Sequence, residues 1–168
     1  MPPDPRTDPR QPVVDRVLGF KPYIVVAARK YGLPWELLAG LVCQESAGKP
    51  SARRHEPKYR WLYGDGPGER PNLPADVTLS DDLILQKWSY GPCQVMGAVA
   101  REYGYAGHLK GLLDPEINLE YGARHLANKI KQAHGDVRGG LLLYNGGGDK
   151  AYPDRVEAWA ALFQGGRR

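Results

Sequence analysis

The sequence predicts a single, mainly α-helical domain of the α+β type, interrupted by one long loop insertion. Through most of the chain, apolar residues recur three and four positions apart, which is the spacing of one helix face. Alternation of apolar and polar residues is almost absent, so we expect at most a small β-hairpin, placed in the insertion. Residues 51–91 form that insertion, because their many prolines and glycines break any helical period.

The composition limits the number of domains. The chain has 168 residues, 42% of them hydrophobic, which suffices for one core but not for a second domain. We expect this domain to span residues 13–164. Residues 1–12 hold five prolines among charged residues and are expected to be a disordered, proline-rich lead, while residues 165–168 are expected to be a flexible tail.

The first half of the chain predicts three helices. Two are expected over residues 13–18 and 23–31, the second of them capped at its C-terminus by Gly32. The third runs from Pro34, whose missing N–H costs nothing in a first helical turn, to Ser46.

Glu45 continues the apolar stripe of this third helix, because it lies four residues after Leu41. Burial disfavours a charged carboxylate and raises its pKa, which would leave Glu45 able to donate a proton near neutral pH. The pattern alone also allows a helix-end carboxylate that reaches sideways to an arginine or to solvent.

The insertion carries aromatic residues at alternate positions. Tyr59, Trp61 and Tyr63 are expected to form a wall against which a ligand stacks. A short helix is expected to begin at Ser80 and to reach Trp88.

Four further helices are expected after the insertion. Three begin at Pro92, at the N-cap and first-turn pair Asp114-Pro115, and at the N-cap Asp136, and the last spans residues 154–163. Gly122 in the middle of the longest helix predicts the close approach of another helix.

The charges and cysteines exclude several classes of function. The net charge of +4 is mild, and basic residues are spread over the chain, which argues against nucleic-acid binding. Four scattered histidines predict no metal, and no stretch approaches the roughly 20 apolar residues that a membrane span needs. Cys43 and Cys93 give no disulfide framework, and no nearby histidine would activate either as a nucleophile.

Three segments place polar groups where an apolar helix meets a loop: Gln44-Glu45-Ser46, residues 89–96 and residues 143–147. In this order they resemble the soluble lytic transglycosylase domain, a relative of goose-type lysozyme, whose signature is Glu-Ser, then Gly-Leu-Met-Gln, then Ala-Tyr-Asn-Ala-Gly. Residues 114–122 resemble the Asp-Pro, Asn, Gly helix of that family. The resemblance covers about residues 23–163. It implies a lysozyme-like fold and cleavage of the β-1,4 bond between N-acetylmuramic acid and N-acetylglucosamine in peptidoglycan.

The resemblance also implies residue roles. Glu45 matches the single catalytic acid of the family, which protonates the glycosidic oxygen and then takes the proton of the muramic O6 hydroxyl to close a 1,6-anhydro ring. Tyr144 matches the tyrosine that hydrogen-bonds this glutamate. Substrate contacts are implied for residues in or beside the motifs: Ser46, Tyr90, Gln94, Met96, Tyr121 and Asn145. The alternatives are a core tyrosine for Tyr144, a helix C-cap for Asn145 and a first-turn residue for Gln94. We expect Ser46 to support Glu45 rather than to act as a nucleophile.

The chain departs from the family pattern in two ways. Pro92-Cys93 replaces Leu-Met and Leu143 replaces Ala, which keeps apolar character at these positions. The insertion also adds Glu56 close behind the catalytic helix. Glu56 is either a second carboxylate that activates water for inverting hydrolysis, or the partner of a loop cation such as Arg53 or Arg60.

The sequence therefore predicts a monomeric lytic transglycosylase that acts on peptidoglycan glycan strands through Glu45 without a cofactor. The alternatives are a lysozyme-type muramidase on the same bond, a glycosidase on chitin-like polymers, and a non-catalytic glycan-binding or virion structural module. Because no apolar leader precedes the first helix, we expect synthesis in the cytoplasm and action on the cell wall. This suits a phage endolysin released through a holin, or an enzyme carried by a virion or a secretion apparatus.

Overall fold

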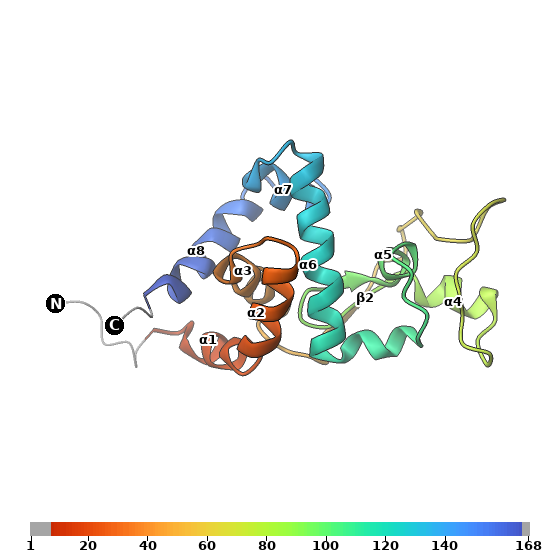
Figure 1. Cartoon of the computed structure of the whole chain (residues 1–168), viewed down its shortest axis with the longest axis horizontal. Coiled ribbons are helices and arrows are strands. Elements are labelled where there is room, and N and C mark those ends of the chain that lie inside the picture. Colours follow the sequence, from red (N-terminus) through yellow and green to blue (C-terminus); the bar gives the residue numbers. More distant parts are fainter. Residues whose placement is uncertain (1–7, 166–168) are drawn as a thin grey trace.

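The computed structural model of the chain describes residues 8–165. In this part the chain is mainly helical and holds one small three-stranded antiparallel sheet, which confirms the predicted α+β class (Figure 1). The insertion and the sheet lie on one side of the long helix α6 (Pro115–Gln132), and α1 (Gln11–Leu18), α2 (Lys21–Lys30), α3 (Trp35–Ser46) and α8 (Tyr152–Gln164) lie on the other. None of the described helices is long and apolar enough to cross a bilayer.

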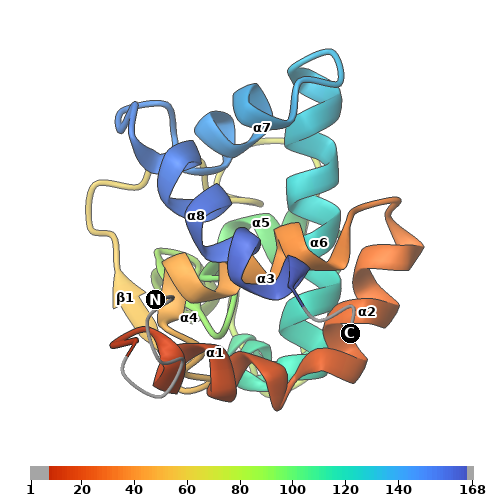
Figure 2. The same ribbon diagram turned by 90° about the vertical axis from the view of Figure 1, so that its left-hand side faces the viewer.

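Helix α3 is the centre of the core (Figure 2). Leu38, Leu41 and Val42 on this helix are fully buried, and α3 packs most extensively on α8. A Cβ atom on Gly40 would lie 2.6 Å from the Val156 carbonyl oxygen, so only glycine lets the two helices come this close. The end of α3, and with it Glu45, is thereby fixed against the start of α8.

The N-terminal helix starts earlier than predicted. Helix α1 begins at Gln11, inside the lead expected to be disordered, because Pro12 is tolerated in a first helical turn. The rest of the predicted lead through residue 7, and residues 166–168 of the predicted tail, lie outside the described residues.

Two strands of the sheet lie at the two ends of the insertion, and the third follows it. Strand β1 (Arg53–His55) pairs with β2 (Trp88–Tyr90), and β2 pairs with β3 (Val95–Met96), so β2 is central. An antiparallel β1–β2 pair thus lies within the insertion, where a small β-hairpin was predicted, and β3 extends it beyond residue 91. The strands are too short to show an alternating pattern.

Two helices near the insertion differ from the prediction. Helix α4 (Leu79–Leu85) is capped by Thr78, whose hydroxyl accepts a hydrogen bond from the Asp81 amide, and not by Ser80. It ends before Trp88, which lies in β2. Residues 91–94 form a turn, so the helix expected to start at Pro92 is instead α5 (Gly97–Glu102).

The C-terminal helices follow their predicted caps. After the 3-10 helix η2 (Leu109–Leu113), the Asp114 carboxylate accepts hydrogen bonds from the amides of Glu116 and Ile117 at the start of α6. Asp136 caps α7 (Val137–Tyr144) in the same way.

Gly122 of α6 does mark a close approach, but the neighbour is not a helix. A Cβ atom there would lie 2.5 Å from the side chain of Cys93, so the turn over residues 91–94 packs directly on the α6 backbone.

Candidate active site

The three sequence motifs meet at one cleft of about 370 Å³. The end of α3, the sheet, the start of the insertion and the end of α7 enclose it. Its lining residues are Glu45, Arg54, Glu56, Lys58, Tyr59, Trp61, Ser89, Gln94, Met96, Tyr144, Asn145 and Gly146. Eight of the twelve side chains predicted for the site line this cleft, which the fold assembles from segments about a hundred residues apart.

Glu45 is half-buried in the last turn of α3. Burial raises the pKa of its carboxyl group, and the hydrogen bond from Tyr152 and the positive charge of Arg54 lower it by less. The net effect is a raised pKa, so a larger share of Glu45 is protonated near neutral pH than for an exposed glutamate. This matches the requirement for a general acid.

The tyrosine bound to Glu45 is Tyr152, not Tyr144. The Tyr152 hydroxyl, on a side chain that is 2% exposed, donates a hydrogen bond to Glu45 Oε1. Burial and the nearby Glu45 charge raise the pKa of Tyr152, so it stays a donor. The close packing of α8 on α3 brings Tyr152 to this position.

Tyr144 has a different partner from the one predicted. Its hydroxyl donates to the carbonyl oxygen of Cys93 at 2.7 Å, because α7 ends facing the turn over residues 91–94. Tyr144 lines the cleft beside Asn145 and helps to hold this turn. It does not hydrogen-bond Glu45 in this structure.

Gln94 at the edge of the cleft fixes the turn. Its Nε2 group donates to the carbonyl oxygens of Ala52 (3.1 Å) and Gly91 (3.0 Å), and its Oε1 accepts from the Ser89 hydroxyl at 2.8 Å. Both amide hydrogens are thus in use, and one lone pair of Oε1 is left for a substrate donor. The predicted contact of the Gln94 amide with a substrate acetamido or hydroxyl group can therefore be made only through Oε1, as an acceptor.

Asn118 secures the same turn from α6. It is fully buried, and its Oδ1 accepts a hydrogen bond from the Cys93 amide at 2.7 Å. Its Nδ2 donates to the carbonyl oxygens of Tyr90 (2.7 Å) and Leu112 (2.8 Å). The Asp-Pro, Asn, Gly helix therefore holds the second motif in place.

Four predicted site residues lie away from the cleft. Ser46 is buried and donates to the Val42 carbonyl of its own helix, and Tyr90 is buried and donates to the Leu85 carbonyl. Tyr63 donates to Glu69. Each of these hydroxyl groups donates to another group of the protein away from the cleft.

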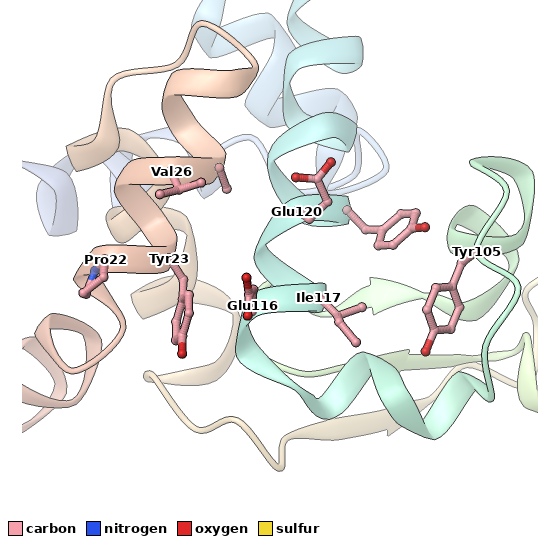
Figure 3. Close-up of a pocket in the computed structure, with 9 residues that line it drawn as sticks. Pro22, Tyr23, Val26, Tyr105, Glu116, Ile117 and Glu120 are labelled. Carbon is pink, nitrogen blue, oxygen red and sulfur yellow. The ribbon is translucent and has the colours of Figure 1, made fainter.

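Tyr121, the fourth, lines a separate pocket of about 550 Å³ between α2 and α6 (Figure 3). Successive residues of an α-helix are rotated by about 100°, so Tyr121 points to a different side of α6 from Gly122, which packs on the 91–94 turn.

The insertion supplies one side of the cleft. The rings of Tyr59 and Trp61 lie 5.5 Å apart, edge to face, and Trp61 is 75% exposed. Glu56 also lines the cleft, where it forms an ion pair with Arg54. The cation-paired alternative for Glu56 is thus the one seen, with Arg54 as the partner in place of Arg53 or Arg60.

Within residues 8–165, no cluster of three or more His, Cys, Asp or Glu side chains could hold a metal ion. Cys43 and Cys93 are both free and buried. Burial raises the pKa of both thiols, that of Cys43 to about 12, which keeps them protonated and unreactive.

Sequence reasoning missed five residues of the site: Arg54, Lys58, Ser89, Gly146 and Tyr152. The sequence around Tyr152 signals a helix start, because Pro153 follows a glycine-rich loop. That signal does not say which helix the tyrosine faces.

Comparison with known proteins gives one match. The family model described as "Transglycosylase SLT domain" matches residues 22–155, which include Glu45, the cleft and Tyr152. Searches of curated proteins and of solved structures gave no match.

Proposed function

The chain belongs to the transglycosylase SLT domain family, which implies peptidoglycan-cleaving activity in general, and from this premise we propose its specific reaction. The enzyme cleaves the β-1,4 bond between N-acetylmuramic acid and N-acetylglucosamine and leaves a 1,6-anhydro ring on the muramic residue. The observation that carries the proposal is the Glu45–Tyr152 pair in a cleft built from all three motifs.

Glu45 acts twice in this reaction. Protonated Glu45 gives its proton to the glycosidic oxygen as the bond from this oxygen to C1 of the muramic residue breaks. The resulting carboxylate then takes the proton of the muramic O6 hydroxyl, and O6 bonds to C1. No water is consumed, and Glu45 ends the cycle protonated as it began.

Tyr152 balances the two states of Glu45. Burial favours the protonated acid, whereas the hydrogen bond from Tyr152 stabilises the carboxylate that forms when the proton leaves. A group that serves first as acid and then as base in one cycle needs a pKa at which neither its protonated nor its ionised form is strongly disfavoured.

The insertion provides the saccharide platform. Tyr59 and Trp61 present aromatic faces at the cleft, and such faces pack against the apolar side of a sugar ring. Lys58 places a positive charge beside them, whereas the charge of Arg54 is compensated by Glu56, and a positive charge here favours an acidic wall polymer.

A lysozyme-type hydrolase is the second candidate, because Glu56 lines the same cleft as Glu45. In that case Glu56 would leave Arg54 and deprotonate a water that attacks C1. The Arg54–Glu56 ion pair supports the first candidate, since the Glu56 carboxylate is already engaged by a cation and would have to leave it to reach a water.

Mass spectrometry of muropeptides released from purified peptidoglycan separates the two candidates. Wild type should give products with the mass of the 1,6-anhydro form, one water lighter than reducing ends. Glu45→Gln should give no release, and Glu56→Gln should leave the product masses unchanged. Reducing muramic ends that disappear in Glu56→Gln would establish the hydrolase instead.

Two broader alternatives have their own tests. Retention of glycan strands without turnover would make the protein a binding module, and faster cleavage of N-acetylglucosamine oligomers than of peptidoglycan would make it a chitin-type glycosidase. A phage endolysin role stays a prediction, and cell lysis that depends on co-expression of a membrane-permeabilising protein would support it.

A further inference from the structure

The loop that carries Tyr59 and Trp61 is closed at its base. We call residues 57–62 the wall loop. On one side of it, the Glu56 amide donates to the Lys87 carbonyl at 2.8 Å. On the other, the Tyr63 amide donates to Gln86 Oε1 at 2.7 Å and Gln86 Nε2 donates to the Tyr63 carbonyl at 2.9 Å. The two ends of the loop are therefore hydrogen-bonded to the adjacent residues Lys87 and Gln86.

Gln86 is itself held from within the protein. Its side chain is fully buried, and Nε2 donates a further hydrogen bond to Asp82 Oδ2 at 2.9 Å. Asp82 is bound by Arg101 of α5, whose Nη2 lies 2.7 Å from Asp82 Oδ1, and both side chains of this ion pair are at most 1% exposed.

Arg101 completes the connection to the rest of the fold. Its Nη1 donates to the carbonyl oxygens of Tyr105 (2.6 Å) and Gly107 (2.8 Å). In the described part of the chain, every buried side-chain nitrogen and oxygen has a hydrogen-bond partner. A chain of buried contacts thus runs from α5 through Asp82 and Gln86 to the wall loop.

We propose that Gln86 is a positioning residue for saccharide binding, which fixes the wall loop so that Tyr59 and Trp61 face the cleft before substrate arrives. This inference rests on the proposed function, since it takes a sugar ring as the ligand of the wall. Trp61 is 75% exposed and has little packing of its own to hold it. A loop without its anchor would lose conformational freedom on binding, and that loss weakens affinity.

The test uses Gln86→Met, which keeps the size of the side chain, removes both hydrogen bonds to Tyr63 and the one to Asp82, and leaves Arg101 as the partner of Asp82. The probe is tetra-N-acetylchitotetraose, with binding measured by calorimetry in a Glu45→Gln background. We expect Kd to rise about tenfold, the effect of one lost aromatic contact. Saturated turnover of peptidoglycan, measured with Glu45 intact, should stay within about twofold, because Gln86 does not touch the reacting atoms.

Two comparisons separate positioning from general loss of structure. Amide hydrogen exchange should become faster over residues 57–63 in Gln86→Met. Val17→Ala, which weakens the core at α1, should leave both that exchange and Kd unchanged. In a double-mutant cycle with Trp61→Ala, the loss of affinity caused by Gln86→Met should be smaller than in the wild-type background, because part of it acts through the Trp61 ring.

The opposite results distinguish failure of the positioning role from failure of the proposed function. An unchanged Kd in Gln86→Met, or losses that add in the double variant, would refute the positioning role while the proposed function stands. A wild-type protein that neither binds the oligosaccharide nor cleaves peptidoglycan would refute the proposed function, and the inference with it.

Discussion

Tyr152→Phe isolates the hydrogen bond that distinguishes Glu45 from an ordinary buried carboxyl group. The ring stays in place, because Tyr152 is 2% exposed and phenylalanine has nearly the same shape. A hydrogen bond to a charged acceptor contributes about 1.5–3 kcal/mol. If all of this were lost in the transition state, kcat/KM would fall by roughly ten- to 150-fold. The carboxylate charge is only partly formed during proton transfer, so we expect a value toward the lower end.

The pH dependence of kcat/KM shows in which direction the pKa of Glu45 moves. Loss of the donor removes a contact that lowers the pKa of Glu45, so this pKa rises further in Tyr152→Phe. The limb of the profile that reports protonated Glu45 should therefore move to higher pH. Tyr144→Phe is the matched control, because its hydroxyl bonds Cys93 and not Glu45, and its profile should keep the wild-type limb. A shift in Tyr144→Phe with none in Tyr152→Phe would refute the reasoning.

Three further predictions concern stability. Burial raises the pKa of Glu45 in the folded state, so ionisation of Glu45 destabilises the fold as the pH rises through that pKa. Glu45→Gln should therefore raise Tm at neutral pH. In thermal melts this gain should vanish near pH 4, where Glu45 is protonated in both the folded and the unfolded state. Gly122→Ala should cost about 1–3 kcal/mol in denaturant unfolding and lower activity, because the new Cβ meets Cys93; an unchanged midpoint would contradict the close packing. Arg101→Met should lower the free energy of unfolding by about 3–5 kcal/mol, since it leaves Asp82 buried without its cation. A loss below about 1 kcal/mol in urea titration would contradict this role of Arg101.

Local signals in the sequence were sufficient for most helices. The carboxylates of Asp114 and Asp136 cap α6 and α7 as predicted, because an N-cap needs only the amides of the next residues. Glu45 on an apolar stripe could also be recognised, since helical spacing fixes which residues share a face. The order of the motifs then predicted a common site, and in the structure Glu45, Gln94 and Asn145 line one cleft.

What the sequence could not supply depends on contacts between distant segments. Tyr144 ends α7 and Tyr152 begins α8, so both lie beside the same glycine-rich loop. Only the packing of α8 on α3 determines that Tyr152, and not Tyr144, reaches Glu45. Gln94 has a φ of +49°, a backbone conformation that residues other than glycine rarely adopt, and its side-chain amide donates to the carbonyl oxygens of Ala52, just before β1, and of Gly91 in the turn. Neither fact has a signature in local residue spacing.

The pairing of β1 with β2 gives this protein a use in protein engineering. The two strands bring the ends of the insertion side by side, so its length is decoupled from the core. Each doubling of a flexible loop costs only about 0.6 kcal/mol of closure entropy. The Gly66 and Gly68 positions are open, with no neighbour within 4 Å of an added Cβ atom. A fluorescent reporter or an affinity module could therefore be inserted between them without displacing a neighbouring side chain, which makes the insertion a site for attaching probes.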